Sequence, residues 1–209
     1  MTEKSNTRGD PAARSQRAWQ RMLSGRRLDL LDPLPKDIEI ADIAHGLARV
    51  ARWNGQTVGE HAFSVAQHAL LVEEIATATQ PDLARRWRLA ALLHDAPEYV
   101  IGDLISPFKA AIGLDYKAFE MRLLEAIYRR FGLPPSLPDR ITGAIKAADR
   151  VAAYYEATQL AGFAREEALS FFGSPKGVAA VKLAPLPAAE AQRRYLDRFK
   201  TLLLSTQGR

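Results

Sequence analysis

Residues 83–98 read LARRWRLAALLHDAPE, and this stretch carries the strongest signal in the chain for both structure and chemistry. Its apolar residues recur at three- and four-residue intervals, which predicts a helix over residues 82–96. Proline lacks the N–H that a helix interior needs, so this helix is expected to kink or end at Pro97. The imidazole of His94 and the carboxylate of Asp95 therefore stand side by side at the end of an apolar helix.

The segments on either side of this stretch have the same helical spacing. Ser64-Val-Ala-Gln67 has the form of a capping box, which predicts that a helix begins there. No period-2 pattern of any length and no internal repeat is present in the sequence. We therefore expect an all-α chain, with a partly mobile N-terminal extension over residues 1–35 and a single helical bundle over residues 36–209. The other expected helices span residues 38–51, 64–79, 116–131, 138–161 and, as the C-terminal helix, 187–204.

The composition of the 209 residues limits the kinds of site that the chain can build. It has no cysteine, which excludes disulfides and thiolate metal sites, so a metal must be bound by imidazole and carboxylate groups. No apolar run reaches the roughly 18 residues of a membrane span, and residues 1–27 lack the apolar core of a secretory signal. We expect a cytoplasmic protein with no membrane partner. The net charge of +5 indicates either an anionic partner or a solvated basic surface.

Two groups of polar residues, far apart in the sequence, carry the candidate chemistry. Glu98 lies four residues after His94, so both side chains reach one pocket if helical geometry persists past the proline. Asp149 interrupts an alanine-rich apolar helix, where a carboxylate needs a partner such as a metal ion. The alternatives are ordinary exposed acids at a helix end, and an Asp149 that pairs with Lys146 or Arg150 at the surface.

The combined pattern resembles a known family. The string from His94 to Glu98, followed by the string from Gly102 to Lys109, resembles the bacterial 5'-deoxynucleotidase branch of the HD phosphohydrolase superfamily. It is also similar to related phage dNTP phosphohydrolases. Arg52-Trp53 upstream and Lys146-x-x-Asp149 downstream resemble further motifs of that branch. The likeness covers about residues 40–165 and implies an HD-domain helical bundle.

The resemblance implies four metal ligands, of which three map to His94, Asp95 and Asp149. The first ligand of the family is a histidine borne by a helix, and both His61 and His68 are candidates. His68 is favoured because it lies inside the capped helix, and a rigid helix supports a metal ligand better than a loop does. His61 then becomes a loop residue that either contacts phosphate near the pocket or lies at the surface.

The resemblance also suggests roles for the residues around the metal. Glu98 is expected to orient or deprotonate a water molecule and Asp103 to assist the leaving group as an acid, although the two roles can be exchanged. Arg52 and Lys109 are the candidates that bind phosphate, since cations must stabilise the charge that develops there. Trp53 either stacks on a base or sugar or simply packs in the core.

The resemblance implies a metal-dependent phosphohydrolase that removes the 5'-phosphate of (deoxy)nucleoside monophosphates. Imidazole and carboxylate ligands favour one manganese, iron or cobalt ion per site, with zinc or magnesium also compatible. One alternative is a dNTP triphosphohydrolase that releases triphosphate. Another is a non-catalytic, metal-stabilised module that binds nucleotides or nucleic acid, but binding alone gives no use to Glu98 and Asp103. Nucleic acid is therefore not the expected partner, and the family implies a homo-oligomer, with a dimer favoured.

Overall fold

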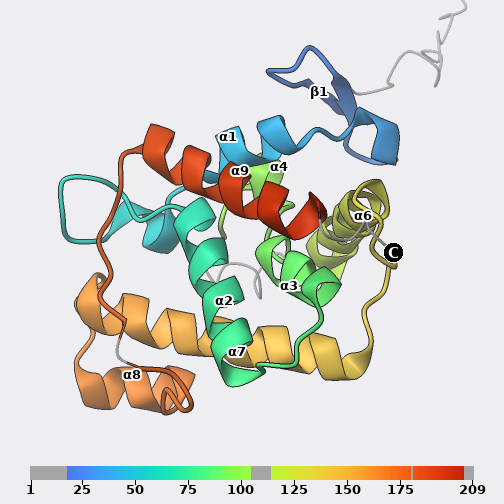
Figure 1. The fold of residues 1–209 in the computed structure, drawn as a ribbon. Helices are drawn as coiled ribbons and strands as arrows, with labels where there is room; N and C mark the ends of the chain where they lie inside the picture. Colours follow the sequence, from blue (N-terminus) through green and yellow to red (C-terminus); the bar gives the residue numbers. More distant parts are fainter. Residues whose placement is uncertain (1–17, 105–113, 180, 205–209) are drawn as a thin grey trace, which may run out of the picture.

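A largely buried helix, α2 (Val65–Thr79), lies at the centre of a helical bundle and crosses α7 (Asp139–Gln159) (Figure 1). The computed structural model describes residues 18–104, 114–179 and 181–204. Helix α2 begins where the side chain of Ser64 accepts a hydrogen bond from the backbone N–H of Gln67, which satisfies a donor left open at the helix start. The side chain of Gln67 does not complete a capping box but hydrogen-bonds the backbone of residues 184–186.

The other helices surround α2 and α7. Helices α3 and α9 pack against α2, whereas α1 packs against α4 and α9, and α8 packs against α7. The buried side chains of α1, α3, α4 and α9 join those of α2 and α7 in one core, whereas Ala168 of α8 packs with Tyr154 and Ala157 in a second, smaller cluster. Burying a large aliphatic side chain contributes about 1.5–3 kcal/mol. The bounds are η2 (Pro35–Asp37), α1 (Ile40–Leu47), η3 (Arg52–Gly55), α3 (Arg85–Leu92), α4 (Glu98–Ile101), α6 (Leu114–Arg130), α8 (Arg165–Phe172) and α9 (Ala188–Leu204).

Close packing between α1 and α4 fixes the position of α4, which begins at Glu98. A Cβ atom on Gly46 of α1 would lie 2.8 Å from Cβ of Tyr99 and 2.9 Å from the backbone oxygen of Tyr99. Because backbone atoms cannot move aside as a flexible side chain can, only glycine permits this approach. Gly46 therefore helps to place Glu98, the neighbour of Tyr99.

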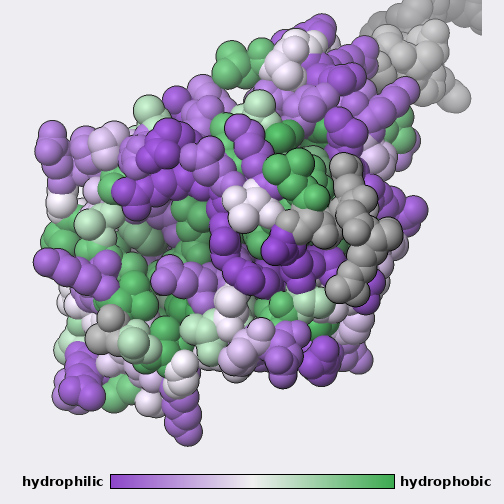
Figure 2. Space-filling model, viewed as in Figure 1, coloured by the Kyte–Doolittle hydropathy of each residue, from purple (hydrophilic) through white to green (hydrophobic). Residues whose placement is uncertain are grey.

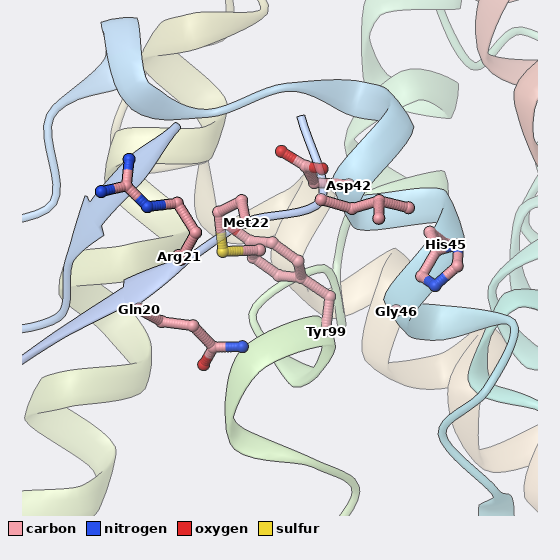
Figure 3. Close-up of a pocket in the computed structure, with 8 residues that line it drawn as sticks. Gln20, Arg21, Met22, Asp42, His45, Gly46 and Tyr99 are labelled. Carbon is pink, nitrogen blue, oxygen red and sulfur yellow. The ribbon is translucent and has the colours of Figure 1, made fainter. Parts of the chain in front are cut away.

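The N-terminal part of the described chain forms a small antiparallel hairpin of β1 (Trp19–Arg21) and β2 (Arg27–Asp29). The carboxylate of Asp42 on α1 accepts hydrogen bonds from the backbone N–H and the hydroxyl of Ser24 at 2.9 and 2.6 Å, which attaches the hairpin to the bundle. A cavity of about 460 Å³ lies between the hairpin, α1 and Tyr99 (Figure 3). None of the predicted site residues in the described ranges lines this cavity.

The expected all-α class is confirmed, because the described residues contain no strand beyond the two of the hairpin. Helices α2, α6, α7 and α9 begin and end within two residues of their expected bounds. The helix expected over residues 82–96 is shorter, since α3 ends at Leu92 and residues 93–97 form a turn before α4. The helix expected over residues 38–51 is also shorter. The hairpin and α8 are additions that the sequence pattern does not predict.

The surface over the first half of α9 is hydrophilic in the view of Figure 2, which is that of Figure 1. Exposed side chains of Glu190, Arg193 and Arg194 form ion pairs there, at 2.7 Å for both pairs with Glu190. These pairs lie in water and contribute little stability. None of the helices in the described ranges combines the length and the apolar character that a bilayer crossing requires.

Candidate metal centre

The four predicted metal ligands come together from three parts of the fold. His68 lies on α2, His94 and Asp95 lie in the turn between α3 and α4, and Asp149 lies on α7. The ligand atoms of His68, His94 and Asp149 all lie within 4.8 Å of one another. An oxygen of Asp95 lies 3.3 Å from Nε2 of His68 and 3.1 Å from Nε2 of His94. The crossing of α2 and α7 therefore builds the centre.

Both imidazoles present Nε2 to this centre. Nδ1 of His94 lies 2.8 Å from the backbone oxygen of Ala91, and Nδ1 of His68 lies 2.6 Å from a carboxylate oxygen of Glu156. Each Nδ1 is thus placed to donate its hydrogen to oxygen, which leaves Nε2 as the ligand atom. Both Nε2 atoms are buried and form no directed hydrogen bond with the described residues. This donor set of two imidazoles and two carboxylates fits a divalent metal ion.

The charges around the centre favour a cation. Burial lowers the pKa of His68, and so does Arg52, but Glu156, Asp149 and Asp95 together raise that pKa well above its ordinary value. Burial raises the pKa values of Asp95 and Asp149, yet the two histidines hold both below their usual range. Because metal ions and protons compete for the same ligand atoms, a place that favours a proton also attracts a metal cation.

Glu156 is a site residue that the sequence analysis missed. It lies on α7 and is fully buried. Burial raises its pKa, but His68, Arg52 and Trp53 together lower it to about 2, so the carboxylate is ionised at neutral pH. The sequence does contain a signal for Glu156. It follows Asp149 by seven residues, which is two helical turns, so the two side chains share one face of the helix.

Arg52 and Trp53 lie beside the centre in the short turn η3. An antiparallel bridge between Ala51 and Ser64 attaches this turn to the start of α2. Trp53 and Asn54 have φ angles of 56° and 50°, in a left-handed region that few residues other than glycine adopt. Non-glycine residues in this region are typical of functional sites, where surrounding contacts hold the strained backbone.

Arg52 is held between two carboxylates. Its Nη1 donates to Asp103 at 3.0 Å and its Nε donates to Glu156 at 3.3 Å. Burial lowers the pKa of Arg52, but Glu156, Asp103, Asp95 and Glu98 raise it above its ordinary value, so the guanidinium keeps its charge. Its Nη2 has no hydrogen-bond partner in the part of the chain that the structure describes, which leaves donors for an anion.

Trp53 takes part in packing and in hydrogen bonding. Its indole Nε1 donates to Glu156 at 2.9 Å, the same oxygen that Arg52 contacts. Its ring packs against Phe163 and Phe172, with centroid separations of 5.5 and 6.0 Å. The packing role expected for Trp53 is therefore present, while stacking on a base or sugar stays a prediction.

The two residues predicted to handle protons lie next to the centre. Glu98 is 1% exposed, and its backbone N–H donates to the backbone oxygen of Asp95 at 3.0 Å. The carboxylate of Asp103 accepts a hydrogen bond from Arg52, so in the structure it positions the guanidinium. Its role as an acid stays a prediction, and Lys109 lies outside the described residues.

The remaining histidines are not part of the centre. His61 lies in the loop before α2 and is partly exposed, and the cluster of possible ligand atoms in the described residues contains His68 and not His61. His45 lies on α1 and lines the cavity beside the hairpin. The fold thus places near the metal centre the histidine that the helix argument favours.

Comparisons with known proteins place the chain in a family. Residues 41–167 match the family described as 5'-deoxynucleotidase YfbR-like. An uncharacterized protein of Rhodobacter capsulatus is 58% identical over 197 residues, which cover 92% of this chain and 100% of that protein. The uncharacterized protein YfdR of Escherichia coli is 30% identical over 169 residues, which cover 79% of this chain and 85% of that protein.

Proposed function

The chain belongs to the YfbR-like 5'-deoxynucleotidase family of the HD superfamily, and from this premise we propose that it hydrolyses the 5'-phosphate of deoxynucleoside monophosphates with a bound divalent metal ion. The observation that carries the proposal is the pair of buried Nε2 atoms, of His68 and His94, that face Asp95 and Asp149 without a directed hydrogen bond. Such atoms are costly to bury unless a ligand satisfies them.

His68, His94, Asp95 and Asp149 would hold the divalent ion, which would supply a Lewis acid and lower the pKa of a water molecule in the site. The exposed fractions of the four proposed ligand side chains indicate from which side a substrate reaches the centre. These are 0% for His68, 11% for His94, 24% for Asp95 and 41% for Asp149. Substrate therefore approaches from the side of the two aspartates, where solvent already reaches the carboxylates.

Glu98 has the role of proton transfer, and Arg52 has the role of stabilising the negative charge of the phosphoryl group. Glu98, buried beside the ligand turn, accepts the proton of the attacking water as a general base. The water oxygen forms a bond to phosphorus, and the bond between phosphorus and the 5'-oxygen breaks. The 5'-oxygen leaves with the nucleoside and takes up a proton, for which Asp103 is the candidate donor. Arg52 offers its free donors to the phosphoryl oxygens, whose negative charge grows in the transition state.

The experiment is a substrate panel with the purified chain, loaded with Mn²⁺, Co²⁺ or Mg²⁺ and offered dAMP, dADP and dATP. Inorganic phosphate from dAMP supports the proposal. Tripolyphosphate from dATP, with no reaction of dAMP, replaces it with a triphosphohydrolase. A chain that binds Mn²⁺ in a calorimeter and releases phosphate from none of the substrates is a non-catalytic metal-stabilised module.

A further inference from the structure

The carboxylate of Glu156 receives three donors from two different segments, α2 and η3. Its Oε1 faces Nδ1 of His68 at 2.6 Å, and its Oε2 accepts from Nε of Arg52 at 3.3 Å and from Nε1 of Trp53 at 2.9 Å. One donor belongs to a proposed metal ligand on α2, and the other two belong to the turn η3. One buried side chain therefore contacts both the metal side and the substrate side of the centre.

Only a carboxylate satisfies this set of donors. The indole and guanidinium nitrogens cannot accept a hydrogen bond, and Nδ1 of His68 must donate when Nε2 binds a metal. Both oxygens of Glu156 must therefore accept at the same time. A glutamine of the same shape accepts on one side and turns an NH₂ group toward donors on the other, which leaves buried donors unpaired and is therefore costly.

The contact with Trp53 also bears on backbone strain. Trp53 and its neighbour Asn54 hold positive φ angles, a conformation that is strained for a bulky residue such as Trp53 and persists only when other contacts fix it. The hydrogen bond to Glu156 and the packing on Phe163 and Phe172 are such contacts. Loss of the hydrogen bond frees the turn that also carries Arg52.

We propose that Glu156 is a positioning residue that holds the metal ligand His68 and the pair Arg52–Trp53 in one arrangement, so that metal binding and phosphate binding depend on the same carboxylate. The part that concerns phosphate rests on the proposed function. The part that concerns the metal does not, because it is measured with Mn²⁺ alone.

The decisive variant is Glu156→Gln, with the Mn²⁺ affinity measured by isothermal titration calorimetry. Groups that orient a metal ligand typically contribute about 10–100-fold to metal affinity, and we expect a loss in that range. In the substrate arm, at saturating Mn²⁺, we expect KM for dAMP to rise more than kcat falls, because Arg52 and Trp53 are no longer held in place. Wild-type Mn²⁺ affinity in folded Glu156→Gln would overturn the inference.

The chain provides a matched control in Glu73 on α2. Glu73 is 2% exposed and accepts from Arg88 at 2.9 Å and from Arg198 at 2.7 and 2.8 Å, and neither arginine is a proposed metal ligand. Glu73→Gln removes a buried carboxylate in the same way and is expected to lower stability without changing Mn²⁺ affinity. An equal loss of Mn²⁺ affinity in both variants would mean that Glu156 has only a structural role, and would overturn the inference.

Two further variants keep the test decisive if Glu156→Gln does not fold. Glu156→Asp keeps the charge and both acceptor oxygens but retracts them by one methylene, and Trp53→Phe removes one donor without touching a metal ligand. Both are expected to weaken Mn²⁺ binding, Trp53→Phe the less. If neither Glu156 variant folds, unchanged Mn²⁺ affinity in Trp53→Phe overturns the inference. A wild-type chain that binds Mn²⁺ but hydrolyses no nucleotide defeats the proposed function alone.

Discussion

Two buried glutamates, Glu156 on α7 and Glu73 on α2, have similar surroundings when only burial and charge are considered. They are 0% and 2% exposed, and each accepts hydrogen bonds from at least one arginine. Glu73 joins α2 to Arg88 of α3 and Arg198 of α9, so its partners tie helices together. The side chains of these arginines are 25% and 30% exposed.

Glu156 differs from Glu73 in where its partners lead. The imidazole that it contacts turns its other nitrogen toward Asp95 and Asp149. The guanidinium that it contacts also reaches Asp103, beside the proposed substrate path. A buried charge therefore does not by itself mark a functional site. The two glutamates differ in what their hydrogen-bond partners contact next. A partner of Glu156, His68, has a second ring nitrogen that forms no directed hydrogen bond and faces the candidate metal centre.

The largest expected effect, on activity and metal binding, comes from removing a proposed metal ligand at the centre that Glu156 adjoins. Asp149→Ala deletes one of the four proposed ligand groups and is expected to reduce phosphate release to the background of the assay. In the wild type, Mn²⁺ at about 100 times its Kd should raise the free energy of unfolding by about 2.7 kcal/mol. Urea denaturation with and without Mn²⁺ should show that increment in Glu73→Gln and not in Asp149→Ala. An Asp149→Ala chain with full metal content and activity contradicts the site.

The next effect separates metal binding from chemistry. Glu98→Gln keeps the shape of a buried side chain that is not among the four ligands, but it removes the proposed general base. We expect kcat to fall by about 10²–10⁴-fold, while the calorimetric Mn²⁺ affinity stays close to that of the wild type. Steady-state kinetics with dAMP give the first quantity. Unchanged kcat would transfer the role of base to another group, with Asp103 as the first candidate.

A smaller effect, on stability alone, is expected when Glu73 is substituted. Glu73→Gln leaves Arg88 and Arg198 without their carboxylate, and their side chains are 25% and 30% exposed, so water compensates part of the loss. We expect unfolding to become easier by about 1–3 kcal/mol, measured by urea denaturation, with kcat and KM for dAMP unchanged. A change in kcat of tenfold or more would show that this network also reaches the centre, and the contrast with Glu156 would be lost.

The sequence predicts much of this architecture because the relevant signals are local. The apolar spacing and the Ser64 cap place α2, and with it His68, within one residue of the observed bounds. The pair His94–Asp95 follows an apolar helix before a proline, and Asp149 interrupts the alanine-rich stretch of residues 144–153. Each of these residues is conspicuous in its own segment, so no knowledge of the packing is needed to select it.

Other features depend on contacts between segments and leave weaker signals. Glu156 shares a helical face with Asp149, but only the crossing of α2 and α7 shows that this face meets His68. From the sequence alone, Arg52 is expected to bind phosphate without other partners. In the fold it also contacts two carboxylates, those of Glu156 and Asp103. The hairpin has strands of three residues each, too short for an alternating pattern to emerge.

The smallest expected effect tests the choice between the two histidines that the sequence leaves open. His61 lies in a partly exposed loop, whereas His68 is 0% exposed and contacts Glu156, Asp95 and Asp149. Substitutions at surface positions usually change free energies by less than about 0.5 kcal/mol, so Mn²⁺ affinity in His61→Ala should stay within about twofold of the wild type. His68→Ala, as the paired variant, should lose the metal. If His61→Ala empties the site while His68→Ala retains Mn²⁺, the first ligand lies in the loop, and Glu156 contacts a histidine that binds no metal.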